Sequence, residues 1–250
     1  MKNDIFLTSK LDLYTKDSSG RKVAHSISNY NGLIENFKTS IKGYKNFLYI
    51  ASTEENYFLN DEYANVTFKS FDMTLPFENY YILDGRTLNK INELIIKADF
   101  IFISGGNVDS QNNFFQKCNL RKAIEKTSAV ICCVSAGTMN SAEKVYCPPE
   151  NEIELNDKKF QKSYIGLGLT KINVLPHFDV LLKTTICEKK YIEDIIYPDS
   201  YDKEIFALTD KSYIQIKSNN KIIYHGEIYL IKSGKLQLLT KIKAKEGNYE

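Results

Sequence analysis

The stretch Ala129-Val-Ile-Cys-Cys-Val-Ser-Ala-Gly-Thr-Met-Asn140 decides the fold of this chain. Its first six residues, 129–134, form an apolar run typical of a strand that is buried on both faces in a parallel sheet. Ser135 follows at once, and the small residues Ala136 and Gly137 come next. Small residues suit a sharp turn from strand to helix, because the two backbones approach closely there. The stretch therefore predicts a strand–turn–helix unit.

Outward from this unit, apolar runs alternate with stretches of helical periodicity. We expect strands at 5–8, 46–51, 80–83, 99–103 and 171–175, and helices at 31–42, 87–97 and 111–126. Such alternation predicts an α/β fold with a mostly parallel, flavodoxin-like central sheet and helices on both faces. The aromatic segment 56–78 fits neither pattern clearly.

The last third of the chain changes character. Short strands are expected at 206–208, 212–217, 221–224, 227–231 and 236–239, and Asn219-Asn220, Gly226 and Ser233-Gly234 separate them as hairpin turns do. We expect these antiparallel strands to close one edge of the same domain. No linker, repeat or low-complexity tract interrupts the chain, so residues 1–250 are expected to form a single domain.

Composition excludes several classes of function. The chain has 33 basic and 31 acidic residues, a net charge of +2, and its lysines are dispersed, so no nucleic-acid partner is expected. No apolar run approaches the ~20 residues that span a bilayer, and the first ten residues lack the apolar core of a signal peptide. The five cysteines, an odd number without a CxxC pair, favour a reducing cytoplasm. With three histidines as well, no metal and no other cofactor is expected.

The predicted turn suits nucleophilic catalysis. Ser135 would lie exposed at the carboxyl end of the sheet, and the Ala136 N–H would lie near a helix N-terminus, where it can stabilise an oxyanion. The pattern resembles Gly-x-Ser-x-Gly, although Cys133 replaces the first glycine. The Ser-Gly-Gly-Asn turn at 104–107 also ends a strand, so the Gly106 N–H is a candidate second donor. Among three histidines, His177 is best placed at a sheet end, after Pro176.

Three blocks then resemble a known family in order and spacing: FISGGN at 102–107, VSAGTMN at 134–140 and GLGLTKINVLPHFD at 166–179. Together they resemble the peptidase E family of serine peptidases, which includes aspartyl dipeptidase and cyanophycinase. The resemblance covers roughly residues 80–215 and is nearest to a Gram-positive branch. It implies a fold similar to class I glutamine amidotransferases, with serine in place of the nucleophilic cysteine.

The resemblance also implies roles for single residues. Ser135 matches the nucleophile, His177 the base, and Gly106 and Ala136 the oxyanion positions. For the acid, Glu150, fifteen residues after the serine, is preferred over Asp210; Glu152 and Asp179 are weaker candidates. Asn107, Gln111 and Asn112, at and just past the glycine turn, are expected to line the substrate pocket. The arginine near the acid in aspartyl dipeptidase is missing from 141–154, so aspartyl specificity is not implied.

The expected function is a serine peptidase that hydrolyses short peptides or related amides through an acyl-enzyme, with a homodimer allowed by the resemblance. Two alternatives stay open. One is a ligand-binding domain that keeps the turn without turnover, because a fold does not fix a function. The other is a cysteine-dependent amide hydrolase that uses Cys132 or Cys133, although cysteines inside a buried strand are usually inert.

Overall fold

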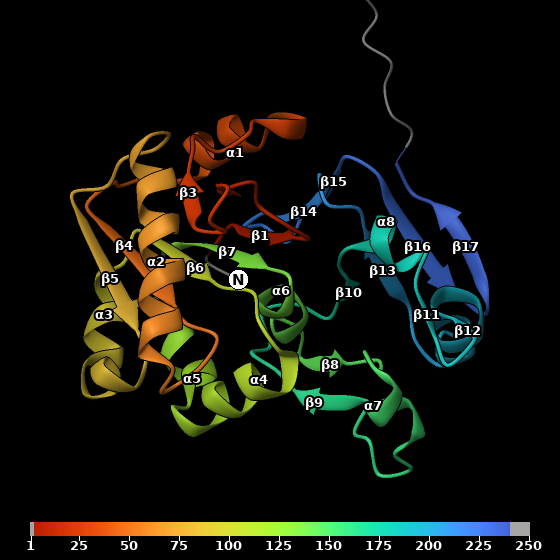
Figure 1. Ribbon diagram of the computed structural model, residues 1–250. Helices are drawn as coiled ribbons and strands as arrows, with labels where there is room; N and C mark the ends of the chain where they lie inside the picture. The colour runs from red at the N-terminus through yellow and green to blue at the C-terminus, as the bar shows by residue number, and fades with distance from the viewer. Residues whose placement is uncertain (1–2, 241–250) are drawn as a thin grey trace, which may run out of the picture.

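The computed structural model describes residues 3–240, and within them a seven-stranded sheet forms the centre of the molecule (Figure 1). In spatial order its strands are β15 (Ile222–His225), β14 (Tyr213–Ile216), β1 (Ile5–Thr8), β7 (Val130–Val134), β6 (Phe100–Ile103), β4 (Asn46–Ile50) and β5 (Asn79–Leu83). The strands β1, β7, β6, β4 and β5 run parallel to one another, whereas β14 pairs antiparallel with both β1 and β15. The predicted α/β class with a mostly parallel sheet is confirmed.

Helices cover both faces of the sheet because its strands are apolar on both faces. In β1, Ile5 and Leu7 join one buried cluster, and Phe6 joins the cluster on the opposite face. The first cluster packs under α3 (Ile91–Lys97), α4 (Val108–Lys117) and α5 (Leu120–Ile124), and the second under α1 (Leu33–Ser40) and α2 (Tyr57–Asp72). Two short 3₁₀ turns, η1 (Tyr30–Gly32) and η2 (Gly85–Lys90), precede α1 and α3.

Two expected elements differ in detail from the structure. The helix expected at 111–126 is two helices, because Asn119 takes a left-handed conformation (φ 51°) between α4 and α5. The unassigned segment 56–78 contains α2. Its N-cap is Asn56, whose side-chain oxygen accepts a hydrogen bond from the Leu59 N–H.

A second sheet lies beside the first, at the right of Figure 1. Its order is β10 (Asn173–Leu175), β13 (Ile205–Leu208), β16 (Ile228–Lys232) and β17 (Lys235–Leu238), with β10 and β13 parallel. It packs against α8 (Phe178–Leu181), the π-helical turn η3 (Tyr191–Ile196) and α9 (Tyr197–Asp199), around a separate apolar cluster.

The late strands divide between the two sheets. Of the five late strands, only β14 and β15 close an edge of the central sheet. The other three pair with one another and with β10, because Ile205, Ala207 and Ile231 bury their side chains against η3 and α8.

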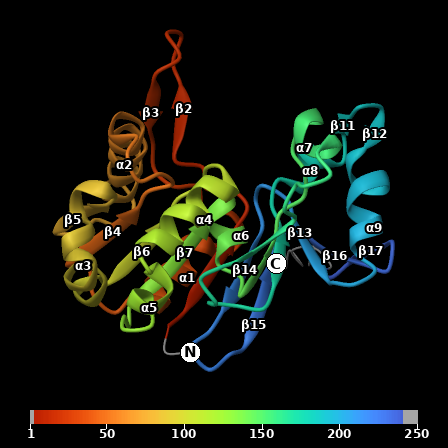
Figure 2. The ribbon, with the colours of Figure 1, turned by 90° about the horizontal axis from the view of Figure 1, so that it is seen from below.

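Smaller elements complete the described chain. Three hairpins are β2 (Tyr14–Lys16) with β3 (Lys22–Ala24), β8 (Lys144–Tyr146) with β9 (Ser163–Ile165), and β11 (Thr185–Ile186) with β12 (Lys189–Lys190); two short helices are α6 (Ala136–Asn140) and α7 (Glu152–Asn156). Figure 2 shows the β2–β3 hairpin standing out beside α2. Among the helices of residues 3–240, none is long and apolar enough to cross a membrane.

Candidate active site

Ser135 lies on a strained turn between β7 and α6. Its φ of 50° and ψ of −115° fall outside the regions that a non-glycine residue usually adopts. Such strain persists only where the surroundings hold it, and it concentrates at functional sites. Here the surroundings are tight: a Cβ atom on Gly137 would come within 2.6 Å of the carbonyl oxygens of Ile103 and Ser104. The small residues after Ser135 therefore let α6 lie directly against the end of β6.

His177 and Asp210 both come from the second sheet. His177 follows β10 and Asp210 follows β13, and these two strands are parallel neighbours. Because the carboxyl ends of parallel strands meet at one edge, the two side chains lie close together. His177 itself takes a left-handed backbone conformation (φ 58°, ψ 33°), which turns it from β10 into α8.

A chain of hydrogen bonds joins the three side chains. His177 Nε2 lies 2.9 Å from Ser135 Oγ, and His177 Nδ1 lies 2.6 Å from Asp210 Oδ1. The hydrogen bond from His177, together with contacts to Ser9 and Lys10, lowers the pKa of Asp210 although the carboxyl is partly buried. An ionised carboxylate can only accept, so Nδ1 carries the proton and Nε2 is left as the acceptor for the serine hydroxyl.

Ser9 supports this chain and was not predicted from the sequence. It is fully buried directly after β1, and its Oγ donates to Asp210 Oδ1 at 3.0 Å. The same oxygen accepts a hydrogen bond from the backbone N–H of His177 at 2.7 Å. Lys10 Nζ lies 3.6 Å from the other carboxylate oxygen of Asp210. The position of Ser9 at the end of a predicted strand was the signal in the sequence that could have identified it. β1 pairs in parallel with β7, so Ser9 follows β1 at the same edge of the sheet at which Ser135 follows β7.

Glu150, the preferred acid, is not the hydrogen-bond partner of His177; Asp210 takes that position. Glu150 lines a cavity that Ser135 and His177 also line. Desolvation by surrounding atoms and the neighbouring Glu154 raise the pKa of Glu150, an effect that His177 partly offsets. A fixed spacing after Ser135 carries no information about which strand pairs with β10, so it could not predict the partner of His177. Of the weaker candidates, Asp179 accepts the backbone N–H of Asp210, and Glu152 begins α7.

Two of the three expected substrate-contacting residues are buried instead. Gln111 is 0% exposed and donates to the Ser104 carbonyl, and Asn112 is 3% exposed and donates to Asn140. Asn140 also donates to Gln111, so the three amides form a network beneath the Ser135 turn. Asn107 is exposed, and its Oδ1 accepts the N–H of Ser110 at the start of α4. Its contact with a substrate stays a prediction.

The expected oxyanion positions lie beside the serine. Gly106 and Ala136 line the same cavity as Ser135, and Ala136 is the first residue of α6, where an N–H has no acceptor within its own helix. A Cβ atom on Gly106, whose φ is 156°, would come within 2.5 Å of the Ser52 Cβ. Glycine therefore lets the backbone pass close to Ser52.

The cysteines of β7 do not reach the site. Cys132 and Cys133 are both fully buried, and burial raises the pKa of each thiol well above its usual value. A thiol needs access and a lowered pKa to act as a nucleophile. This argues against the cysteine-dependent alternative. Within residues 3–240, no three His, Cys, Asp or Glu side chains are grouped closely enough to hold a metal ion.

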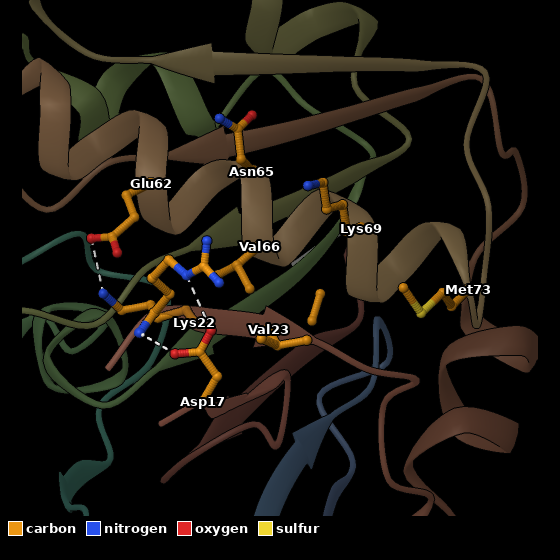
Figure 3. Close-up of a pocket in the computed structure, with 10 residues that line it drawn as sticks. Asp17, Lys22, Val23, Glu62, Asn65, Val66, Lys69 and Met73 are labelled. Carbon is orange, nitrogen blue, oxygen red and sulfur yellow. Dashed lines mark hydrogen bonds and ion pairs between the residues drawn. The ribbon is translucent and has the colours of Figure 1, made fainter. Parts of the chain in front are cut away.

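Two cavities meet at Ser135 and His177. One, of about 560 Å³, lies toward α2 and the segment that leads from β1 into the β2–β3 hairpin. The other, of about 180 Å³, lies toward α6 and α8. A further cavity, of about 540 Å³, lies between the β2–β3 hairpin and α2, where Figure 3 shows Lys22 and Glu62 facing each other. None of its lining residues belongs to the chain of Ser135, His177 and Asp210.

The chain is similar to a known peptidase family and to solved peptidase structures. The model of peptidase family S51 matches residues 19–224. A peptidase from an acI-B1 Actinobacterium has a similar structure, with a TM-score of 0.65 and 17% identity over 96% of this chain and 95% of that one. A putative peptidase E protein from Listeria monocytogenes EGD-e has a TM-score of 0.58 and 19% identity over 89% of this chain and 97% of that one. No curated protein matches.

Proposed function

Since the chain belongs to peptidase family S51 and is therefore a serine-type peptidase, we propose that Ser135, His177 and Asp210 form its catalytic triad. The observation that carries the proposal is the continuous chain of hydrogen bonds from Ser135 Oγ through both ring nitrogens of His177 to Asp210. Nucleophile and base within hydrogen-bond reach, with the base oriented by a third group, is the arrangement that activates a serine.

In the proposed reaction, Ser135 is the nucleophile, His177 transfers the protons, and two backbone N–H groups bind the oxyanion. His177 Nε2 takes the proton of Ser135 Oγ as that oxygen bonds to the carbonyl carbon of a peptide. The N–H groups of Gly106 and Ala136 stabilise the oxyanion that forms. When the intermediate collapses, the C–N bond breaks and His177 gives its proton to the leaving amine. Water, activated in turn by His177, then hydrolyses the acyl-enzyme and restores Ser135.

Labelling with a fluorophosphonate probe tests this proposal. We expect the wild type to be labelled, and the variants Ser135→Ala and His177→Ala to lose labelling, because the first lacks the nucleophile and the second its base. Circular dichroism of each variant serves as the control for folding. A folded wild type that is neither labelled nor able to hydrolyse peptides would contradict the proposal and favour a ligand-binding domain without turnover.

Short peptides are the proposed substrates, because the two cavities beside Ser135, of about 560 and 180 Å³, have room for a few residues. The homodimer, the cytoplasmic location and the single-domain organisation stay predictions. Light scattering coupled to size exclusion would test the first, and cell fractionation the second.

A further inference from the structure

The two cavities that meet at Ser135 differ in size and chemistry, and this difference selects among peptides. Both are lined by Ser135, Gly106 and His177, so a peptide bond at the serine would place one substrate residue in each cavity. The larger one falls within the ~300–1,000 Å³ range of small-molecule sites. The inference that follows rests on the proposed function and adds a substrate class to it.

The walls of the larger cavity are mostly apolar and aromatic. They come from the segment that leads from β1 into β2, from α2, and from the ends of β4, β6 and β7. Tyr49 and Phe102 stack with ring centroids 5.6 Å apart, and Tyr14 meets Tyr63 edge to face at 6.3 Å. The remaining apolar side chains are Leu11, Leu13, Leu59 and Val134. An aromatic side chain buried here removes its apolar surface from water and gains ring contacts as well.

The two cavities are lined by different charged side chains, and this difference would orient a bound peptide. Glu150 is the acidic side chain that lines the smaller cavity. The larger cavity is lined by Lys10, Lys16 and Asp12. Asp12 already accepts from Ser28 and pairs with His25. Lys10 pairs with Asp210, whereas Lys16 makes no ion pair within the described part of the chain.

A dipeptide carries opposite charges at its two ends. With its ammonium group near Glu150 and its carboxylate near Lys16, the C-terminal residue would occupy the larger, aromatic cavity. We propose that the preferred substrates are dipeptides or short peptides with a large apolar or aromatic residue on the C-terminal side of the bond that is cleaved, and a small residue on its N-terminal side.

A panel of five dipeptides tests this inference: alanyl-phenylalanine, phenylalanyl-alanine, alanyl-alanine, alanyl-aspartate and aspartyl-alanine. Full-length protein is used, and kcat/KM is measured for each by release of free amino acid, with Ser135→Ala as the blank. We expect alanyl-phenylalanine to be hydrolysed with a kcat/KM at least ~10-fold above that of the other four, as burial of one aromatic side chain allows.

A pair of leucine variants connects the preference to the larger cavity. Leu59→Trp fills part of that cavity, so the ratio of kcat/KM for alanyl-phenylalanine to that for alanyl-alanine should fall. The matched control is Leu182→Trp, on an exposed leucine at the end of α8 that lines neither cavity. It should leave both rates and their ratio unchanged. A general loss of stability would lower both rates together and would not move the ratio.

Other outcomes overturn the inference in distinguishable ways. A preference for an aspartyl peptide, or for phenylalanyl-alanine, contradicts the substrate class or the direction while the peptidase stands. Labelling of Ser135 by a fluorophosphonate without hydrolysis of any of the five dipeptides also overturns the inference alone. Absence of both labelling and hydrolysis in folded protein overturns the proposed function together with it.

Discussion

At the scale of single residues, two carboxylates near His177 differ in how they contact it. Asp210 accepts the hydrogen bond from the Nδ1–H of His177, whereas Glu150 lines the smaller cavity. We expect Asp210→Asn to lower kcat by ~10³–10⁴-fold, because an amide there no longer fixes the histidine tautomer. Glu150→Gln should mainly raise KM. Steady-state kinetics on one dipeptide measures both, and a larger loss of kcat in Glu150→Gln would restore Glu150 as the acid.

Ser9 is a positioning residue, since it touches both the acid and the backbone of the base but not the reacting atoms. Ser9→Ala removes one hydrogen bond to a charged group and leaves the His177 N–H without its acceptor. We expect kcat to fall by ~10–100-fold, from about 1.5–3 kcal/mol, with little change in KM.

The matched control for Ser9 is Ser200→Ala. Ser200 is also buried, and its Oγ likewise donates one hydrogen bond and accepts one, to Tyr197 and from Gly234. Both variants should lose similar stability in urea, but only Ser9→Ala should lose kcat. Equal kcat in the two variants would mean that Ser9 serves stability alone.

The sequence indicated those residues of the site that have a recognisable pattern in the residues next to them. Ser135 stands out because an apolar run ends in small residues, and His177 because a strand and a proline precede it. Asp210 could not be ranked above Glu150, because its position depends on the pairing of β10 with β13. These strands are distant in the chain, since Asn173 pairs with Ile205. Gln111 and Asn112 were misplaced for a similar reason: polar residues at a helix start look exposed until Asn140 is known to lie beneath them.

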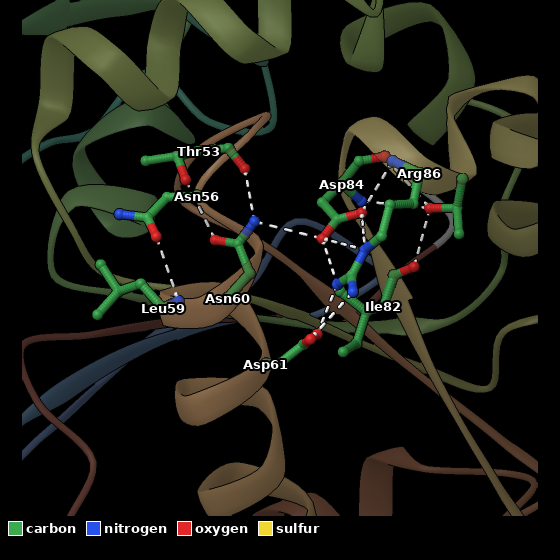
Figure 4. Close-up of polar contacts among 9 residues, drawn as sticks. Thr53, Asn56, Leu59, Asn60, Asp61, Ile82, Asp84 and Arg86 are labelled. Carbon is green, nitrogen blue, oxygen red and sulfur yellow. Dashed lines mark hydrogen bonds and ion pairs between the residues drawn. The ribbon is translucent and has the colours of Figure 1, made fainter.

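At the scale of elements, the turn after β5 depends on a buried carboxylate. Asp84 is 0% exposed and caps η2. Its carboxylate accepts hydrogen bonds from Arg86 and Asn60, and Arg86 also donates a hydrogen bond to Asp61 (Figure 4). Arg86→Ala leaves Asp84 without its cationic partner. We expect a loss of about 1–3 kcal/mol in the free energy of unfolding, measured by urea denaturation.

An exposed ion pair provides the control for Arg86. Lys232 and Glu204 lie 2.7 Å apart with side chains 58% and 48% exposed. Lys232→Ala should change the free energy of unfolding by less than ~1 kcal/mol, as is usual for surface pairs. If Arg86→Ala lowers the free energy of unfolding no more than Lys232→Ala does, the hydrogen bonds from Asn60 and the backbone are sufficient to stabilise the Asp84 carboxylate.

Elements were predictable where their periodicity is strong and local. The strands of the parallel sheet appeared as apolar runs, but the order of the late strands did not follow from them. A run such as 205–208 is equally apolar whether it pairs with β1 or with β10. The break between α4 and α5 was missed because Asn119, unlike glycine or proline, does not mark an end on its own.

At the scale of the whole molecule, carboxylates with lowered pKa connect parts that are distant in the chain. Burial alone would raise the pKa of Asp4, but hydrogen bonds from Ser40, Lys217 and Ser218 lower it from its usual 3.8. These contacts join the start of β1 to the end of α1 and to the chain after β14. The pKa of Asp210, which joins the two sheets, is lowered from the same value.

A carboxylate whose pKa is lower in the folded state stabilises the fold above its unfolded pKa, and this stabilisation is lost as the pH falls through the folded value. We therefore expect the free energy of unfolding to decrease as the pH falls below about 3.8. In Asp4→Asn the stability at pH 7 should be lower and its decrease in acid shallower, because the titrating group is gone. Glu125→Gln, at an exposed position, should follow the wild type. Urea denaturation between pH 7 and pH 2.5, followed by circular dichroism, gives the free energy of unfolding of the wild type and both variants. If this free energy decreases with falling pH as steeply in Asp4→Asn as in the wild type, Asp4 is excluded as a source of the acid sensitivity.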